Sequence, residues 1–553
     1  MKKKHWILFI LILILARLSY AQSSRFLIEF DNKDINNNPF SLNHPEEYLS
    51  SKAVERRERF NIPVDLSDLP ISPRYIDSIR PFIKGIQNRS KWMNALVAEI
   101  DSAYIDTIGT FSFVEELQFL APGIHNYSKG NNKGIQGVDT SELKTETMVT
   151  DSAFYGYSWE PISMLNGHLL HQNQHRGETM VIAVLDAGFR NVDKLPVFEY
   201  MRKNNQILGI RDFEENDGQV FDTHNHGTMV LSLLAGYIPE VYIGTAPEAN
   251  YWLLRTEVGS SEYLIEEYNW IAAAEFADSA GADIINSSLG YTTFDDTTQN
   301  HNFRDLNGST TPISQAASMA ASKGMLVVSS AGNMGDDSWQ YISAPADADS
   351  ILTVGSVDPN QNYAFFSSTG PTFDGRIKPD VAAQGMANVV QNTDSSFVMA
   401  SGTSFSAPII SGLAACLWQK FPDLNNIELM EKLIQSGNQY ASPDSLIGYG
   451  IPNFSRAGNI NIEDLSKSSV KIFPNPFKNH FYINIPEVNL GDDPIYLEIF
   501  DLMGRKIVTR QLSQSLAGTR IRINTLSENP SGIYLIKLSL KPDYVIKQKM
   551  VKY

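Results

Sequence analysis

The chain has 553 residues, 42% of them hydrophobic, which is too long for one ordinary domain and predicts roughly three or four folded units. Its 62 acidic residues outnumber 45 lysines and arginines, and the formal net charge of −17 argues against nucleic acid as a partner. Only one cysteine, Cys416, is present, so an exported form must hold together without intramolecular disulfides.

The amino terminus has the pattern of a secretory signal peptide. Three lysines precede an apolar run over residues 6–16, and small residues at Ser19 and Ala21 stand before Gln22, which predicts cleavage after Ala21. As a helix this run would span about 16 Å, too short for a hydrocarbon core of about 30 Å. No later run approaches that length, so we expect a soluble mature chain without a transmembrane segment.

Residues 22–145 are predicted to be a small α+β unit and a linker. "RFLIEF" and "MNALVAEID" favour strands, and "HPEEYLSSKAVERRERFNI" between them is rich in helix formers. Residues 123–151 are poor in apolar side chains and rich in Gly, Asn and Lys, which is typical of a linker.

Residues 146–460 are predicted to be one α/β domain. Short apolar runs that stop at glycine or a polar cluster alternate there with segments of helical length. This alternation predicts a parallel sheet with helices on both faces, a three-layer αβα fold whose sites gather at the carboxyl ends of strands. The strands are predicted in "TMVIAVLDAG", "NYWLLRTEV", "ADIINSSLG", "MLVVSSAGN" and "SILTVGSVD", and the helices in "HGTMVLSLLAG", "YLIEEYNWIAAAEFADSAG", "PISQAASMAASKG" and "SFSAPIISGLAACLWQKFP".

Residues 468–553 are predicted to form a β-sandwich. Several short alternating runs, such as "IYLEIFDLMG" and "GIYLIKLSL", are joined by Gly, Pro and Asn without helical segments. The charge is reversed here, since residues 467–553 contain 13 Lys and Arg against 7 Asp and Glu, a balance of +6.

Three residue types of nucleophilic catalysis stand at the ends of predicted elements. Asp186 ends a strand, and His226 and Ser404 each open a helix. A serine hydroxyl is a poor nucleophile unless an imidazole takes its proton, and the imidazole needs a carboxylate to fix its tautomer and stabilise its charge.

Ser404 is the predicted nucleophile among the hydroxyls of its segment. The start of a helix presents free amides and a positive dipole end to an oxyanion that develops beside the hydroxyl. Thr403, Ser401 and Ser406 fit cap or turn roles, and capping would be the default for a lone serine. Asn333, which ends the strand in "VVSSAGN", can donate its amide to the same oxyanion, although by itself it would be read as a turn residue.

These segments resemble the signature blocks of the subtilases, the subtilisin-like serine peptidases, over roughly residues 155–456. "VIAVLDAGF", "HNHGTMVLSLLAG" and "GTSFSAP" match the aspartate, histidine and serine blocks in the family's order, and "SSAGN" matches the oxyanion segment. The resemblance implies a subtilisin-like fold and a serine endopeptidase. The substrate-binding residues that it implies are Ser287, Ser288, Leu289 and Gly290 on one wall and Ser330, Ala331 and Gly332 on the other.

The chain departs from the family pattern at a few positions. Met229 stands where many relatives have a second histidine, and we expect it to pack in the helix. Ala187 replaces the commoner Thr or Ser after the aspartate, which removes a hydroxyl beside Asp186 and alters the hydrogen bonding of its carboxylate. His224 is interpreted as a surface loop residue.

No cofactor is required by this chemistry, and a structural calcium ion stays unassigned. Many subtilases bind calcium, and "RDFEENDGQVFD" is rich in acidic side chains, but Asp217 stands where the EF-hand pattern needs glycine. A solvated acidic loop is therefore favoured over a metal site. The acidic residues concerned are Asp212, Glu214, Asp217 and Asp222.

The flanking units also resemble known companions of this domain. Residues 25–124 are similar to the propeptide region of secreted subtilases from the Bacteroidetes, although a permanent domain remains an alternative. The tail, with "FPNPF", "SGIYLIKL" and "KQKMVKY", resembles the sorting domain of the type IX secretion system, with an adhesive sandwich as the alternative. The expected partners are protein or peptide substrates and that secretion machinery, and we expect a monomer that is secreted or attached to the cell surface through the outer membrane.

Two rival functions remain open. A cell-surface binding protein could use the subtilase fold as a scaffold, although such a scaffold would not need all four site residues. An esterase could use the same residues, but the G-x-S-x-G elbow typical of many esterases is missing from the sequence.

Overall fold

The computed structural model describes residues 23–123 and 151–459 and, in the tail, residues 471–552 with short gaps at 474, 476, 485–494, 502–503, 513–519, 527–528 and 542–543. The predicted signal peptide and most of the predicted linker lie outside the described residues. The chain divides into two compact units, residues 1–458 and 459–553. No helix in the described ranges has both the length and the apolar character needed to cross a bilayer.

The first described segment, residues 23–123, is a small α+β unit, as the sequence predicts. Four antiparallel strands form a sheet in the order β2-β3-β1-β4, and helices pack against it. An apolar cluster that includes Phe30, Ile76 and Leu96 fills the space between sheet and helices. The strands are β1 (Ser23–Phe30), β2 (Ile83–Ser90), β3 (Ala95–Asp101) and β4 (Val114–Pro122), and the helices are α2 (Ser51–Phe60), α3 (Pro73–Ile79) and α4 (Ile105–Gly109).

The central domain, residues 151–458, is built on a seven-stranded sheet in which every neighbouring pair is parallel, in the order β13-β12-β11-β10-β5-β9-β6. Each strand predicted from the sequence is present, and the sequence reading missed β6 and β13 at the two edges. The strands are β5 (Val181–Asp186), β6 (Ile207–Asp212), β9 (Asn250–Arg255), β10 (Ile284–Ser287), β11 (Leu326–Ser330), β12 (Leu352–Val357) and β13 (Val381–Gln384).

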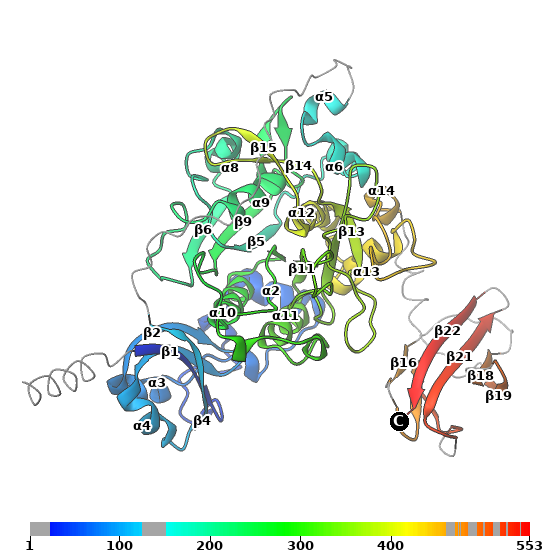
Figure 1. Ribbon diagram of the computed structural model, residues 1–553, viewed down its shortest axis with the longest axis horizontal. Coiled ribbons are helices and arrows are strands. Elements are labelled where there is room, and N and C mark those ends of the chain that lie inside the picture. The colour runs from blue at the N-terminus through cyan, green and yellow to red at the C-terminus, as the bar shows by residue number, and fades with distance from the viewer. Residues whose placement is uncertain are drawn as a thin grey trace, which may run out of the picture. The chain divides into compact units, whose positions relative to one another are not determined.

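Helices cover both faces of this sheet and give the predicted three-layer fold (Figure 1). Successive side chains of a strand point to opposite faces, so in β5 Ile182 and Val184 enter one apolar cluster while Ala183 and Leu185 enter the other. The helices of the first face are α9 (His226–Ala235) and α12 (Thr403–Lys420), and those of the second face are α10 (Ile265–Ala280) and α11 (Pro312–Ser322).

Shorter elements complete the central domain. The hairpin of β14 and β15 packs beside α9, and α13 follows α12 along the chain. These elements are α5 (Asp151–Tyr155), α6 (Trp159–Met164), α7 (His168–Gln172), α8 (Glu199–Lys203), β7 (Tyr237–Ile238), β8 (Tyr242–Ile243), β14 (Asn388–Gln391), β15 (Phe397–Ala400), α13 (Asn426–Gln435) and α14 (Phe454–Ala457).

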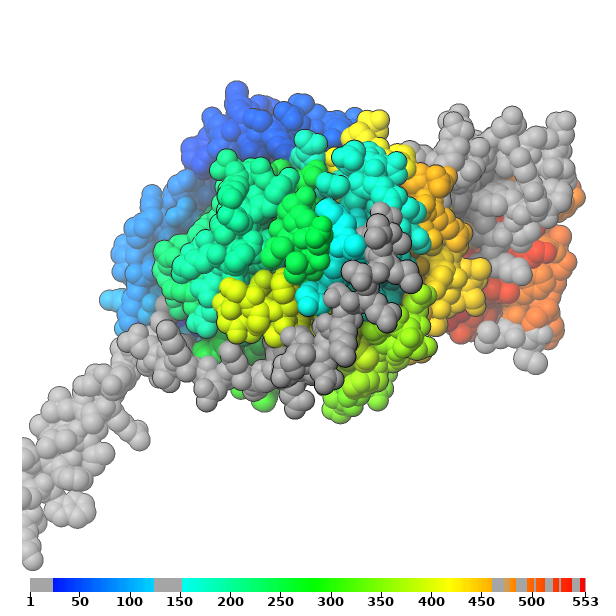
Figure 2. Space-filling model, turned by 90° about the horizontal axis from the view of Figure 1, so that it is seen from above, coloured from blue at the N-terminus to red at the C-terminus, as the bar shows by residue number. Residues whose placement is uncertain are grey.

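The amino-terminal unit packs against the α10 and α11 face of the central domain, and the blue segment lies against the green one in both views (Figures 1 and 2). Asp278 on α10 is fully buried and receives hydrogen bonds from Arg56 and Arg57 at 2.6 and 2.9 Å and from Lys91 at 3.2 Å. Arg57 also reaches Asp68 of its own unit at 2.7 Å.

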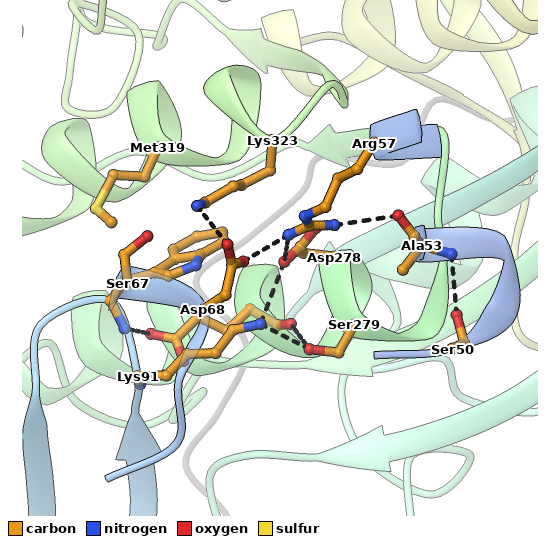
Figure 3. A network of polar contacts seen from close by, with 12 residues as sticks. Ser50, Ala53, Arg57, Ser67, Asp68, Lys91, Asp278, Ser279, Met319 and Lys323 are labelled. Atoms are coloured by element: carbon orange, nitrogen blue, oxygen red, sulfur yellow. Dashed lines mark hydrogen bonds and ion pairs between the residues drawn. The ribbon is translucent and has the colours of Figure 1, made fainter. Parts of the chain in front are cut away.

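A lysine of the central domain also pairs with an acidic residue of the amino-terminal unit. Lys323 of the central domain donates to Asp68 of the amino-terminal unit at 2.9 Å (Figure 3). Because a buried ion lacking its partner is costly, this network fixes how the two parts fit together.

The tail forms two antiparallel sheets, in the orders β16-β17-β20 and β19-β18-β21-β22. One apolar cluster takes residues from both sheets, Phe481 and Ile523 from the first and Leu497 and Ile536 from the second, so the tail is a β-sandwich as predicted. The strands are β16 (Lys471–Phe473), β17 (Phe481–Asn484), β18 (Ile495–Asp501), β19 (Lys506–Leu512), β20 (Arg520–Ile523), β21 (Gly532–Lys541) and β22 (Tyr544–Lys552).

Candidate active site

Asp186 and His226 form a hydrogen-bonded pair. Asp186 is the last residue of β5 and fully buried, His226 is the first residue of α9, and Asp186 Oδ1 lies 2.8 Å from His226 Nδ1. Burial by itself lowers the pKa of His226, but the charge and hydrogen bond of Asp186, with a smaller contribution from Glu257, raise this pKa above its usual value. The carboxylate therefore stabilises a protonated imidazole, as a general base requires.

The other oxygen of Asp186 has no donor among the described residues. Oδ1 also accepts the backbone N–H of Ala187 at 2.8 Å, whereas Oδ2 is buried without a partner. A hydroxyl residue at position 187 could supply that donor. Ala187, which replaces the Thr or Ser of the family pattern, therefore stands next to an aspartate whose Oδ2 lacks a hydrogen-bond donor.

Ser404 lies in the first turn of α12, and a proline in this helix changes the hydrogen bonding of the Ser404 carbonyl. Pro408, four residues later, has no N–H, so the Ser404 carbonyl lacks the usual helical donor. The hydroxyl of Ser288, which follows β10, donates to that carbonyl at 2.9 Å instead. The Ser404 hydroxyl donates to the Ser288 carbonyl at 3.2 Å, and no hydrogen bond joins it to His226 in the described part of the chain.

Thr403 fixes the orientation of Asn333. Asn333 Oδ1 accepts the backbone N–H of Thr403 at 2.8 Å and its hydroxyl at 3.0 Å. The oxygen end of the amide is therefore anchored on α12, which leaves the nitrogen end to donate to another group. The sequence reading treated Thr403 as a cap or turn residue and missed this contact.

The predicted residues meet at one hollow of about 550 Å³. Ser404, His226 and Asn333 line it. Asp186 does not line the hollow but forms a hydrogen bond with His226. Five of the seven predicted substrate-binding residues also line it, namely Ser288, Leu289, Gly290, Ser330 and Gly332.

Ser287 and Ala331 do not line the hollow. The Ser287 hydroxyl accepts the indole N–H of Trp270 at 2.9 Å, and Ala331 belongs to the apolar cluster on the α10 and α11 face. Both side chains are fully buried. The prediction took whole segments, but at these two positions the side chain is packed into the interior of the domain.

The hollow includes residues that the sequence reading did not single out. Ser343, in the segment before β12, lines it and lies against Gly290, because a Cβ added to Gly290 would stand 2.0 Å from the Ser343 hydroxyl oxygen. Glu257, Glu262 and Glu266 line it as well. The sequence offered no signal for Ser343 or for the glutamates, since Glu257 falls in a predicted strand run, Glu266 in a predicted helix run and Glu262 between them.

The acidic loop after β6 is only partly solvated, which refines the sequence interpretation. Asp212 and Glu214 are buried, and Arg255 lies 3.3 and 3.5 Å from their carboxylates. Arg25 of the amino-terminal unit also approaches Glu214, at 3.4 Å. Oxygens of Asp212, Glu215 and Asp217 lie within 4.8 Å of one another, but the nearby arginines supply positive charge, and no metal is assigned.

Comparison with known proteins places the three units. Residues 177–450 match the family model described as Subtilase family, residues 25–134 the Peptidase S8 propeptide domain of Bacteroidota, and residues 471–553 the secretion system C-terminal sorting domain. The fold and site thus define a subtilase domain. The chain belongs to the subtilases that carry a Bacteroidota propeptide domain before this domain and a secretion sorting domain after it.

The curated relatives are serine proteases of modest identity. Serine protease AprX of Bacillus subtilis is 29% identical over 319 residues, covering 52% of this chain and 66% of that protein. The Thermostable alkaline protease of Halalkalibacterium halodurans is 27% identical over 364 residues, covering 65% and 87%. Among solved structures, MycP1 from Mycobacterium smegmatis is similar at 22% identity with a TM-score of 0.44, covering 57% of this chain and 88% of that one.

The sorting domain indicates that the protein is exported from the cell. It marks the chain for export by the type IX secretion system, either to be released or to be attached to the cell surface. The protein is therefore a secreted member of its family.

Proposed function

We propose that this protein is a secreted serine endopeptidase. The observation that carries the proposal is the Asp186–His226 bond of 2.8 Å in a hollow that Ser404 also lines. A binding scaffold would have no use for a carboxylate-oriented imidazole beside a serine at a helix start.

In the proposed reaction, His226 takes the proton of Ser404 as its oxygen attacks the peptide carbonyl. Asp186 keeps the imidazole in the correct tautomer and stabilises its charge. Asn333 and the backbone N–H of Ser404 donate to the oxyanion, and His226 then gives its proton to the leaving amine. Water, activated by His226, releases the acyl group from Ser404.

The substrate is held as an extended strand in this proposal. Ser288, Leu289 and Gly290 form one wall of the primary specificity pocket, and Ser330 and Gly332 form the other, in keeping with their place on the hollow.

Labelling with a serine-directed fluorophosphonate tests the proposal. We expect the purified, exported protein to be labelled at Ser404 and to cleave internal peptide bonds of a protein substrate, with both properties lost in Ser404→Ala. An unlabelled but folded protein would favour the surface binding protein, and a labelled protein that hydrolyses simple esters but no peptide bond would favour the esterase.

The units on either side have proposed roles in maturation. Residues 22–145 act as a propeptide with its linker and are cut off to leave residues 146–460 as the peptidase domain, followed by a sorting domain over residues 468–553. Mass spectrometry of the two ends of the secreted protein tests these boundaries, and an intact segment 22–145 in the active form would contradict them.

A further inference from the structure

The larger sheet of the tail, β19-β18-β21-β22, carries apolar side chains on its outer face as well as on its inner one. In β18 and β21 the side chains that enter the apolar cluster of the sandwich alternate with side chains that point away from it. Tyr496 and Leu535 belong to the outward set and are 40% and 42% exposed. No other large apolar side chain in the described part of the tail is as exposed.

The outward apolar side chains are neighbours and form one strip. Phe500 lies opposite Leu535 in the pairing of β18 with β21. Two residues before Leu535, Ile533 lies opposite Val551 of β22. Phe500, Ile533 and Val551 are half-buried. Single exposed apolar residues are ordinary on a protein surface, but adjacent ones on the same face indicate a contact surface.

Lysines border this apolar strip. Lys506 lies opposite Phe500, with its Nζ 5.7 Å from the centre of the phenyl ring, and Lys549 lies beside the strip on β22. Lys537 donates to Glu498 at 2.9 Å, and Glu498 also pairs with Lys506. Three lysines therefore accompany one carboxylate on the described part of this face, in a tail with a balance of +6 over residues 467–553.

The outer face of the smaller sheet, β16-β17-β20, has a different character. Its described outward side chains are Tyr482 and Arg522, which lie opposite one another. Both contact the ring of His480, at 3.3 and 3.2 Å. Because this face is polar and hydrogen-bonded, the combination of apolar and cationic side chains belongs to one face of the sandwich and not to the tail as a whole.

We propose that the outer face of the β19-β18-β21-β22 sheet docks on the anionic phospholipid surface of a bilayer during export. The apolar strip enters the boundary between head groups and acyl chains, and the lysines at its border reach the phosphates with their long stems. An anionic leaflet attracts each lysine that lies near it, and it repels the rest of the chain, which is acidic. The basic tail is therefore the part that such a surface holds.

Two other occupants of this face fit the observations less well. Protein interfaces are enriched in arginine and depleted in lysine, whereas the three cations at this strip are lysines. A second copy of the tail would bring two positively charged faces together, and like charges oppose such an association. The charge and the composition of the face thus favour a lipid surface.

Vesicle flotation of the full chain carrying Ser404→Ala, which prevents self-processing, tests the proposal. The probes are vesicles of phosphatidylcholine alone and of phosphatidylcholine with about 30% phosphatidylglycerol, at about 0.15 M salt. We expect binding to the anionic vesicles to be stronger by about tenfold or more. Lys549→Gln should weaken it about fivefold, the effect of one lysine near an anionic surface, and Leu535→Ser should weaken it as well.

The matched control is Lys478→Gln, which makes the same change of charge on an exposed residue before β17 of the smaller sheet. This variant should bind the anionic vesicles as the parent chain does. The thermal transition of each variant checks that the tail stays folded.

Three results would overturn the proposal. The first is binding that is absent, or equal for the two kinds of vesicle, which leaves the face to a protein partner. The second is equal weakening by Lys549→Gln and Lys478→Gln, which shows attraction by total charge without a docking face. The third is a concentration-dependent dimer in sedimentation that Leu535→Ser abolishes, which assigns the face to a second copy of the chain.

Discussion

At the scale of single residues, the site depends on side chains that hold other side chains. Asn333 can present its amide nitrogen because Thr403 binds its oxygen twice, and His226 is held by one oxygen of Asp186. The proposed roles of Asp186, His226 and Asn333 follow from motifs, whereas that of Thr403 depends on a contact across 70 residues of sequence.

Removing the oxyanion donor should lower turnover without preventing folding. We expect Asn333→Ala to reduce kcat by about 100- to 1,000-fold, the loss known for one such donor in subtilisin. Thr403→Val should give a smaller loss because the amide is less well held, while Thr403→Ser keeps the hydroxyl and serves as its control. Steady-state kinetics with a peptide substrate measures all three, and unchanged kcat in Asn333→Ala would contradict its role.

The pH profile should report His226. Its pKa is raised, and only the neutral imidazole can take the proton of Ser404, so kcat/KM should fall as the pH drops through a midpoint above 6.5. The measurement needs a substrate that does not itself titrate between about pH 5 and 9. A midpoint below the ordinary histidine value would show that the Asp186 carboxylate does not stabilise the protonated ring.

At the scale of elements, the start of α12 joins Ser404, the proposed nucleophile, to the wall of the hollow. Pro408 deprives the Ser404 carbonyl of its helical donor, and the Ser288 hydroxyl replaces it. The helix start and the segment that follows β10 are therefore joined by two buried hydrogen bonds, one from each serine hydroxyl to the carbonyl of the other serine. Pro408 could be seen in the sequence inside the predicted helix. The sequence did not show that the Ser288 hydroxyl would bind the carbonyl that this proline leaves without a donor.

Ser288→Ala should lower the stability of the central domain. The change leaves a buried carbonyl without a donor, which costs about 1 to 3 kcal/mol. In a Pro408→Ala background the helix regains its own N–H, so the same substitution should cost less. A double-mutant cycle on the calorimetric transition of this domain measures the coupling, and additive effects would show that the two residues do not act on one carbonyl.

At the scale of the whole molecule, the amino-terminal unit is fitted to the central domain through buried charges of both signs. Asp278 lies between Arg56, Arg57 and Lys91, and Lys323 reaches back to Asp68. Burial by itself would raise the pKa of Asp278, but the three cations lower it well below its usual value. Because the unfolded chain binds this proton more readily, the interaction stabilises the precursor above about pH 4 and is lost on further acidification.

Asp278→Asn should destabilise the precursor at neutral pH by about 3 to 5 kcal/mol, since it leaves buried cations without their partner. The measurement is urea unfolding of the full chain carrying Ser404→Ala, which prevents self-processing. Asp77→Asn is the control, because Asp77 lies on α3 of the amino-terminal unit, its side chain is 71% exposed and its ion pair is with Arg80 of the same unit. Equal stability of Asp278→Asn and the control would show that the network does not hold the two parts together.

Much of the fold could be predicted from local pattern. The central strands β5, β10 and β11 are short apolar runs that end at polar residues, and each was recognised because a strand buried on both faces leaves that signature. The edge strands β6 and β13 were missed. β6 carries mostly exposed and half-buried side chains, and β13 has the sequence VAAQ, whose two alanines do not form the run of large or branched apolar residues that marks a buried strand.

The candidate site was predicted in part. The motifs identified Ser404, His226, Asp186 and Asn333 as site residues, but the side chains of Ser287 and Ala331 are packed into the interior and do not line the hollow. The acids Glu257 and Glu266 were not noticed, because nothing local distinguishes a glutamate that faces a hollow from one that faces solvent.

The sequence by itself determined the kinds of unit and their order, because periodicity, turn residues and motif spacing are local properties of the chain. Only the tertiary structure decided which side chains share a space: that Thr403 holds Asn333, that Ser288 replaces the donor that Pro408 lacks, and that three glutamates reach the hollow beside Ser404. These contacts join segments far apart in the chain, and their energies depend on burial and distance, which exist only once the segments have packed together.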